Sequence, residues 1–177
     1  MTFPNLQQTL RLHFLLLSQL RYLRQMDIHL KYLNNAMPEL HHRESGLIGA
    51  AFDMLKKKNI YAELICDGVH VSSPVIRSAF ALFSDNNIVL ISDSIRATGM
   101  SDGIYSLGQQ EVNVKGRYAT LEDETLAGSV TNLYQCFRNA IEIGIPLESA
   151  LKSATINPAK SIGAKGDYGS ISPGKMA

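Results

Sequence analysis

The fold class is indicated most clearly by residues 60–92, IYAELICDGVHVSSPVIRSAFALFSDNNIVLIS. Residues 60–66 form an apolar, β-leaning run that ends at a turn signal, Asp67-Gly68. Ser73-Pro74 then predicts a helix with Ser73 as N-cap, and the following residues place apolar side chains on one helical face. Residues 87–92 form a second strand of the buried type. Strand, helix and strand in this order predict a βαβ unit with parallel strands, and hence an α/β fold.

Beyond this unit the pattern changes. Residues 105–120 alternate apolar and polar side chains around Lys115-Gly116, which predicts an antiparallel β-hairpin inserted into the α/β pattern. Two helices are predicted within residues 133–154. A shorter helix opens at Asn157-Pro158 and stops by Gly163.

Composition limits the class of protein. A chain of 177 residues is long enough for one domain with a substantial core. The formal net charge of +1 gives no reason to expect nucleic acid or an anionic membrane as partner. No apolar run approaches the ~20 residues needed to span a bilayer. The two cysteines, Cys66 and Cys136, are too few for a disulfide scaffold and favour a reduced, cytoplasmic protein.

The N-terminal segment, residues 1–31, differs from the rest in its charge. Its basic residues are Arg11, Arg21, Arg24 and Lys31, and its acidic residue is Asp27. A basic, acid-poor start is typical of an organelle transit peptide or a membrane-surface helix. The interpretation that we favour is a segment outside the fold, for example one read out of frame.

Polar side chains follow the predicted strands at their carboxyl ends, where the reactive groups of parallel α/β folds collect. Asn35 follows a short apolar stretch, and His70 and Asp93 follow the two strands of the βαβ unit. An aspartate there can take a proton from water and return it to a leaving amine, and a histidine can polarise a carbonyl. An aspartate at a strand end is also often a helix cap, and a lone histidine is often a structural hydrogen-bonding group. On spacing alone, the sequence indicates an α/β chain with a candidate hydrolytic site.

A second group of candidate residues lies between these strands. The planar guanidinium of Arg43 can bind two phosphate oxygens at once. The adjacent His41-His42 suggests a metal site, but neighbouring histidines should point apart, and no carboxylate partner is evident. We therefore expect a phosphate contact at Arg43 and no metal at His41-His42.

Short motifs along the chain resemble successive signatures of the N-acetylglucosamine-6-phosphate deacetylases. They are Asn35-Ala36-Met37, His41-His42-Arg43-Glu44 with Gly46, Asp67-Gly68-Val69-His70-Val71, Ser92-Asp93, Leu126-Ala127-Gly128-Ser129, Asn157-Pro158-Ala159 and residues 169–175 (GSISPGK). Each motif alone is weak, but their common order and spacing across residues 32–177 make the resemblance specific.

The resemblance implies a fold. The family belongs to the amidohydrolase superfamily, whose members join a TIM-type (β/α)8 barrel to a small β-sandwich made from both chain ends. This chain would hold the C-terminal portion of the barrel, roughly three of its eight strands, as an incomplete barrel with the hairpin inserted. Residues 32–166 would be the partial barrel, and residues 167–177 the truncated start of the return segment to the sandwich.

The resemblance also implies an activity. The family removes acetate from N-acetylglucosamine 6-phosphate in the cytoplasm, leaving glucosamine 6-phosphate. A divalent metal, zinc or iron, activates the attacking water. By motif, Asp93 would be the catalytic base and acid, and His70 would contact and orient the sugar.

The remaining motif residues would bind the rest of the substrate. The phosphate-binding set would be Asn35, Ala36 and Arg43, with Arg43 acting across the interface of a homodimer. The loop that closes over the acetyl group would consist of Leu126, Ala127 and Gly128.

The metal site departs from the family pattern. Two of the family's ligands, a glutamate and a histidine, precede the matched region, and residues 1–31 contain no counterpart of them. The third ligand is a histidine on the strand before the Asn-Ala-Met motif, and Tyr32 occupies its position here. His29 lies upstream and would have to displace Asn35 to reach that position. The sequence therefore predicts that this chain by itself supplies none of the family's metal ligands.

Two other interpretations remain open on the sequence. One is a catalytically inactive sugar-phosphate binder, or a remnant that docks on a complete deacetylase subunit, because Asn35 and Arg43 are present while Tyr32 replaces the ligand. The other is an amidohydrolase that acts on a cyclic amide. The DGVH and LAGS motifs, which are typical of the deacetylases, speak against the second interpretation.

Overall fold

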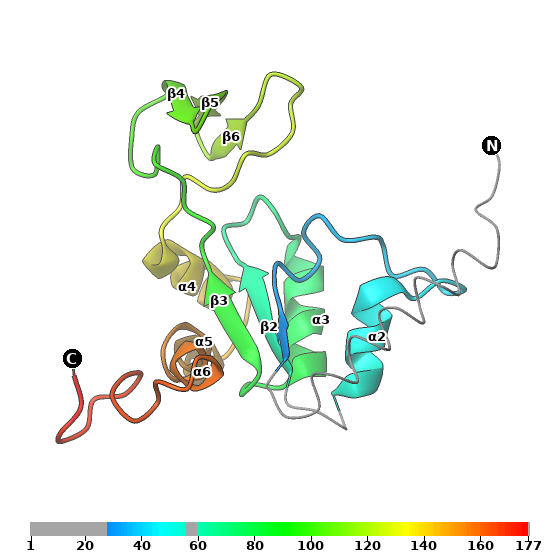
Figure 1. Cartoon of the computed structure of the whole chain (residues 1–177), viewed down its shortest axis with the longest axis vertical. Coiled ribbons are helices and arrows are strands. Elements are labelled where there is room, and N and C mark those ends of the chain that lie inside the picture. Colours follow the sequence, from blue (N-terminus) through cyan, green and yellow to red (C-terminus); the bar gives the residue numbers. More distant parts are fainter. Residues whose placement is uncertain (1–27, 56–59, 177) are drawn as a thin grey trace.

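The computed structural model describes residues 28–55 and 60–176. Its centre is a parallel sheet of β1 (Ile28–Leu30), β2 (Ile60–Ile65) and β3 (Ile88–Ile91), in the order β1-β2-β3 (Figure 1). The predicted βαβ unit and the parallel orientation of its strands are confirmed. Because the three strands are parallel, the loops that follow them open at one edge of the sheet.

Helix α3 (Ser73–Phe83) is the crossover between β2 and β3. Its N-cap is Ser72 rather than the predicted Ser73, and Pro74 lies in the first turn, where its missing N–H costs nothing. The predicted apolar face is buried and belongs to the main core with strand residues such as Leu64 and Leu90. The face consists of Ile76, Ala79, Phe80 and Phe83.

Four further helices in the described part of the chain lie around the sheet. Helix α2 (Gly46–Met54) precedes β2 and has no counterpart among the predicted elements. The predicted series of two helices and a shorter one is confirmed as α4 (Leu133–Glu142), α5 (Leu147–Ala154) and α6 (Ile156–Ser161). Cys136, Ala140 and Ala150 bring α4 and α5 into the main core, in which Cys66 is also buried.

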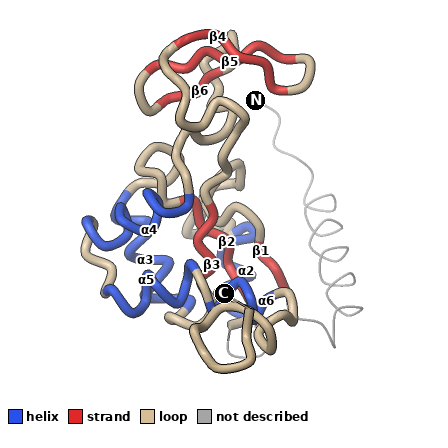
Figure 2. Tube along the Cα trace, turned by 90° about the vertical axis from the view of Figure 1, so that its left-hand side faces the viewer, coloured by secondary structure: helices blue, strands red, loops and turns tan. Residues whose placement is uncertain are grey.

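The predicted hairpin is a three-stranded antiparallel meander in the structure. Its strands are β4 (Gly103–Leu107), β5 (Gln110–Lys115) and β6 (Tyr118–Thr120). The predicted hairpin around Lys115-Gly116 is confirmed by the antiparallel pairing of β5 and β6. The prediction missed a further turn before it, where Gly108 adopts a positive φ of 62° and β4 pairs with β5. The meander has a small core of its own, formed by Ala97, Val112, Val114 and Ala119. It stands beyond the carboxyl ends of β2 and β3 (Figures 1 and 2).

The parallel sheet begins before the predicted domain boundary at residue 32. His29 of β1 pairs with Tyr61 of β2, so residues 28–30 belong to the sheet. The stretch Tyr32-Leu33, predicted as the end of a strand, is a turn, because Tyr32 has a φ of 55° that a strand cannot accommodate. The expectations for residues 1–27 fall outside the described residues.

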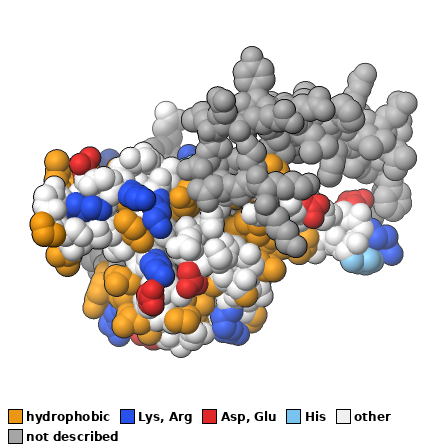
Figure 3. Space-filling view, turned by 90° about the horizontal axis from the view of Figure 1, so that it is seen from below, with side chains coloured by type: hydrophobic (Ala, Val, Ile, Leu, Met, Phe, Trp, Pro, Cys, Tyr) orange, Lys and Arg blue, Asp and Glu red, His pale blue; other side chains and the backbone are white. Residues whose placement is uncertain are grey.

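Residues 163–176 form turns without a helix or strand. This segment folds back on itself: the Lys175 ammonium donates to the Lys165 carbonyl at 2.6 Å, and the Met176 amide donates to the Asp167 carbonyl at 2.9 Å. On the face in Figure 3, charged side chains of both signs alternate with apolar ones. In residues 28–55 and 60–176, no helix has the length and apolar character needed to cross a bilayer.

Candidate functional site at the strand ends

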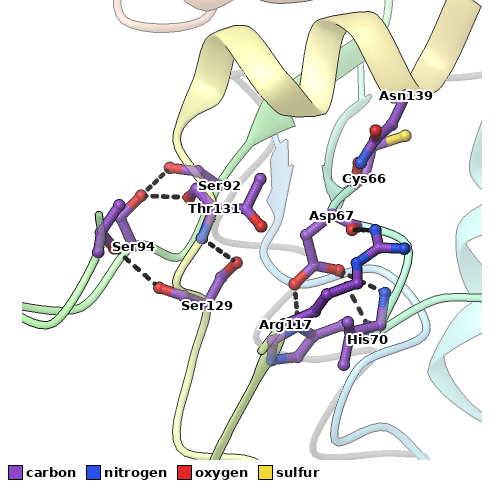
Figure 4. A network of polar contacts seen from close by, with 11 residues as sticks. Cys66, Asp67, His70, Ser92, Ser94, Arg117, Ser129, Thr131 and Asn139 are labelled. Carbon is purple, nitrogen blue, oxygen red and sulfur yellow. Dashed lines mark hydrogen bonds and ion pairs between the residues drawn. The ribbon is translucent and has the colours of Figure 1, made fainter. Parts of the chain in front are cut away.

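The loops after β2 and β3 and the return from the meander meet at the carboxyl edge of the sheet (Figure 4). His70 lies in the loop after β2, and Asp93 directly follows β3 after Ser92. Asn35 lies in the loop after β1. Parallel pairing thus gathers at one edge three polar residues that are far apart in the sequence.

Asp67 and His70 form a buried pair. The Nδ1 atom of His70 lies 2.7 Å from Oδ2 of Asp67, and the two side chains are 2% and 1% exposed. The other carboxylate oxygen of Asp67 accepts the amide N–H groups of Val69 at 2.9 Å and of His70 at 3.0 Å. The loop therefore wraps around the carboxylate, and Gly68 at a φ of 77° makes this tight turn possible.

The contacts of the pair shift both pKa values. Burial opposes ionisation of Asp67, but the hydrogen bonds from the His70 ring and from the two amides outweigh it and lower the pKa of the carboxyl. The hydrogen bond that the His70 ring donates to Asp67 raises the pKa of His70 against the opposing effect of burial. An ionised carboxylate only accepts hydrogen bonds, so Nδ1 of His70 carries the proton and Nε2 remains available for a ligand.

Asp93 is held by the return segment, residues 126–129. The Ser129 amide donates to the Asp93 carbonyl at 2.8 Å, and the Ile95 amide donates to the Ser129 carbonyl at 2.9 Å. Gly128 passes so close that a Cβ there would lie 3.1 Å from the Asp93 carbonyl oxygen and 3.5 Å from its Oδ2 atom. Of the predicted substrate loop, the structure thus brings Gly128 beside Asp93. Leu126 and Ala127 precede it and contact Thr120 and Ala119 of β6.

Ser92, Ser94 and Thr131 reinforce this junction. The Ser94 hydroxyl donates to the Thr131 carbonyl at 2.7 Å and lies 2.8 Å from the Ser92 hydroxyl (Figure 4). The Thr131 amide donates to the buried Ser129 hydroxyl at 3.0 Å. Both sides of the loop are therefore anchored, which limits the positions that Asp93 can adopt.

Tyr32 and Asp93 interact across the site. The negative charge of Asp93 is the main cause that raises the pKa of the Tyr32 phenol, followed by burial, the charge of Glu63 and a side-chain hydrogen bond with Asp93. The phenol therefore keeps its proton at ordinary pH. Tyr32 and Asp93 both have positive φ values, 55° and 53°, which are uncommon for residues with side chains and often mark functional sites.

The proposed phosphate-binding residues are distributed along the loop between β1 and α2. The Asn35 amide donates to the Tyr32 carbonyl at 2.8 Å, and Ala36 is exposed with a φ of 53°. Arg43 is exposed in the same loop, and its backbone amide donates to Nδ1 of His41 at 3.3 Å. The structure therefore keeps Asn35 near the strand ends but does not bring Arg43 to Asp93 or His70 within the described chain.

The histidines His41 and His42 do not point apart as predicted. Their ring centroids are 4.2 Å apart with the planes tilted by 42°. His29, in turn, points to α6, because its Nε2 atom lies 2.8 Å from the Ser161 carbonyl oxygen. Its side chain is thereby engaged away from Asp93.

Sequence reasoning missed two residues of this site. Asp67 was assigned to a turn and to a family motif but not to a pair with His70, although an aspartate and a histidine at i and i+3 around a glycine could have signalled one. Arg117 lies in the turn between β5 and β6, and its Nη2 atom donates to the Asp67 carbonyl at 2.6 Å. No sequence signal connects Arg117 to this loop, because the contact spans the meander.

The described residues do not fit a metal ion. Members of the family that the motifs resemble generally use a divalent metal, and such a site needs at least three ligands. Across residues 28–55 and 60–176, no group of three or more His, Cys, Asp or Glu side chains is arranged to hold one. Burial also raises the pKa of the Cys66 and Cys136 thiols to about 12 and about 11, so neither supplies a thiolate at neutral pH.

Comparison with known proteins agrees with the motifs. The sequence model of the Amidohydrolase family matches residues 26–177. The chain is 39% identical over 150 residues to an N-acetylglucosamine-6-phosphate deacetylase of Caenorhabditis elegans, covering 82% of this chain and 36% of that protein. It is also 39% identical over 144 residues to an N-acetylgalactosamine-6-phosphate deacetylase of Escherichia coli, covering 81% of this chain and 37% of that protein.

Solved structures also show a similarity to the N-acetylglucosamine-6-phosphate deacetylases. The crystal structure of N-acetylglucosamine-6-phosphate deacetylase from Pasteurella multocida superimposes with a TM-score of 0.77 at 30% identity, covering 85% of this chain and 39% of that chain. This chain therefore spans little more than a third of the length of these relatives. The chain belongs to the amidohydrolase family, and it resembles the C-terminal part of its N-acetylglucosamine-6-phosphate deacetylases.

Proposed function

We propose that this chain carries the substrate-orienting and proton-transferring part of an enzyme that hydrolyses the N-acetyl group of N-acetylglucosamine 6-phosphate. The observation that carries the proposal is the meeting of His70, Asp93 and the loop 126–128 at one edge of a parallel sheet in an amidohydrolase. In this proposal the sheet is the last part of an incomplete (β/α)8 barrel, and residues 167–177 begin the return to a β-sandwich.

The roles of the two residues follow from their chemistry. Asp93 accepts a proton from the attacking water as its oxygen bonds to the acetyl carbon. The carboxyl then returns the proton to the sugar nitrogen as the C–N bond breaks, which releases acetate and glucosamine 6-phosphate. His70 is fixed through Nδ1, so its Nε2 atom can hold the acetyl oxygen or a sugar hydroxyl in place.

In the proposal, the phosphate lies at Asn35, Ala36 and Arg43. Arg43 is exposed, which supports the idea that it serves the site of a second subunit in a homodimer. A cytoplasmic location is part of the same proposal. No step is assigned to zinc or iron, because the described residues do not form a metal site.

The test measures release of glucosamine 6-phosphate by the purified chain with zinc added, using wild type, Asp93→Asn and Asp85→Asn. Asp85 is an exposed aspartate just before the amino end of β3 and serves as the matched control. We expect turnover in wild type and Asp85→Asn and a loss of at least ~100-fold in Asp93→Asn. Equal turnover in all three proteins would contradict the role of Asp93. Because the similar proteins include deacetylases of both amino-sugar epimers, N-acetylgalactosamine 6-phosphate is measured in parallel.

A second function is favoured by Tyr32. The negative charge of Asp93 raises the pKa of the Tyr32 phenol, so Tyr32 stands beside the residue that the proposal uses to accept a proton from water. A chain with this pair could bind the sugar phosphate without hydrolysing it, either alone or docked on a complete deacetylase subunit. Calorimetry with N-acetylglucosamine 6-phosphate separates the two functions. Heat of binding without release of acetate supports binding without hydrolysis. No heat of binding with wild type contradicts this second function.

A further inference from the structure

Arg117 connects the meander to the loop that holds His70. Its side chain extends from the turn between β5 and β6 to the end of β2, where Nη2 donates to the Asp67 carbonyl at 2.6 Å (Figure 4). The same nitrogen packs on Gly68, because a Cβ at Gly68 would lie only 2.7 Å from it. The guanidinium therefore needs a glycine beneath it, and Gly68 supplies the space.

The other side of the meander is tied to β3. Where the chain returns from β6, the Ala127 amide donates to the Ala119 carbonyl at 2.9 Å, and the Ser129 amide donates to the Asp93 carbonyl at 2.8 Å. The meander is thus connected to the carboxyl ends of both strands, to β2 through the Arg117 side chain and to β3 through the backbone of the return segment 126–129. A rigid three-stranded unit anchored at two strand ends constrains their relative position.

The anchor on β2 acts on the residue that orients His70. Arg117 holds the backbone of Asp67, while the carboxylate of Asp67 holds the imidazole at 2.7 Å and the amides of Val69 and His70. A hydrogen bond from a charged guanidinium is stronger than one from a neutral donor. We propose that Arg117 is a positioning residue, which through Asp67 and the meander sets His70 relative to Asp93. This inference rests on the proposed function in naming His70 and Asp93 as the working pair.

The first test measures amide hydrogen exchange by NMR in wild type, Arg117→Ala and Lys115→Ala. Lys115 is an exposed basic residue at the end of β5, before the same turn, and is the matched control for charge. We expect the amides of Val69 and His70 to exchange about tenfold faster in Arg117→Ala, which corresponds to one lost hydrogen bond. Core amides in β2 and β3 should keep their rates, and Lys115→Ala should match wild type. Unchanged rates at Val69 and His70 in Arg117→Ala would overturn the proposal.

If Arg117→Ala accelerates exchange throughout β2 and β3 as well, a general loss of stability hides the local effect at Val69 and His70. Arg117→Lys is then the variant that decides. Lysine keeps the charge and can donate one N–H, but it lacks the planar fork. A selective acceleration at Val69 and His70, smaller than in Arg117→Ala, supports the proposal. If exchange at Val69 and His70 is not selectively faster in Arg117→Lys, the proposal is overturned.

The second test separates positioning from stability. It measures the affinity of each variant for N-acetylglucosamine 6-phosphate by calorimetry at a temperature where all are folded, together with the NMR resonance of the His70 Nδ1 proton. We expect about tenfold weaker binding and a shifted resonance in Arg117→Ala, with partial recovery in Arg117→Lys. Affinity and resonance equal to wild type would overturn the proposal. If wild type binds no sugar phosphate, the proposed function fails, while exchange at Val69 and His70 still decides the role of Arg117.

Discussion

Asp67 is the residue on which most contacts of the site converge. Its carboxylate accepts the His70 ring and two amides, and its carbonyl accepts Arg117. Its neighbour Cys66 is held through its carbonyl by the Asn139 side-chain amide at 3.1 Å. A buried carboxylate is stable only when it is so fully paired. The position of His70 is therefore a consequence of Asp67, which the chain places at the end of β2.

Substitution of Asp67 by Asn should uncouple the pair. The side-chain amide keeps one acceptor oxygen but carries no charge, and its N–H groups can face the Nδ1–H group of His70. The free energy of unfolding at pH 6 should therefore fall by about 2 kcal/mol. The pKa of His70, measured by NMR titration, should drop. Asp123→Asn is the control, because Asp123 also accepts an amide, from Thr125 at 3.0 Å, but is exposed, so little change in the urea midpoint is expected. An unchanged His70 pKa in Asp67→Asn would contradict the pairing.

The pair also predicts a pH dependence of stability. The folded pKa of His70 is raised above 6.5, so its contribution is complete below 6.5 and is lost as the pH rises through the folded value. The folded pKa of Asp67 is lowered below 3.8, so its contribution is present above 3.8 and is lost as the pH falls through the folded value. Urea midpoints should therefore decline on the alkaline side of 6.5. The same decline in His70→Gln would contradict this assignment.

At the scale of elements, the return segment 126–129 depends on the absence of a side chain at Gly128. Its φ is 107°, and a Cβ would lie 2.6 Å from Cγ2 of Ile95. Gly128→Ala should therefore destabilise the protein by about 3 kcal/mol through backbone strain and overpacking. Gly108→Ala, at a φ of 62° with nothing within 4 Å, should cost only about 1 kcal/mol. Equal losses in chemical denaturation would show that crowding against Ile95 does not matter.

A second element-scale prediction concerns the junction of α6 and β3. The fully buried Asn157 donates to the Asp85 carbonyl at 2.7 Å and to the Ile88 carbonyl at 2.9 Å. Asn157→Ala leaves both carbonyls without this donor and should lower the free energy of unfolding by about 2–3 kcal/mol. Ser161→Ala removes a hydroxyl that bonds only within the helix, to Pro158, and should lower it by less than about 1 kcal/mol. A larger loss in Ser161→Ala than in Asn157→Ala would contradict this role.

At the scale of the whole molecule, binding of the sugar phosphate should stabilise the folded chain. At about 100 times the dissociation constant, N-acetylglucosamine 6-phosphate should add about 2.7 kcal/mol, seen as a rise in Tm. N-acetylglucosamine without phosphate should raise it less. Arg43→Ala should reduce the gain, whereas Arg138→Ala, which removes an exposed arginine paired with Glu142, should not. Sedimentation with and without ligand then tests whether Arg43 acts within one chain or between two.

Much of this molecule could be predicted from its sequence. The apolar runs at residues 60–66 and 87–92 with a helix between them determine the βαβ unit, because buried parallel strands need continuous apolar segments and a crossover. The motifs ending at His70 and Asp93 lie where such strands must end, so their location at one edge was predictable. The family was also evident from the motifs, since their order and spacing survive in the chain itself.

Tertiary structure alone decided the rest. Strand β1 is short and begins at Ile28, and only its pairing with β2 reveals it. The bond from Arg117 to Asp67 joins residues 50 positions apart through a meander whose first turn the pattern did not show. The effect of the Asp93 charge on the Tyr32 pKa likewise joins two residues far apart in the sequence, both with a backbone at positive φ. Local periodicity determines helices and strands, whereas long-range contacts depend on how those elements pack, which no local pattern encodes.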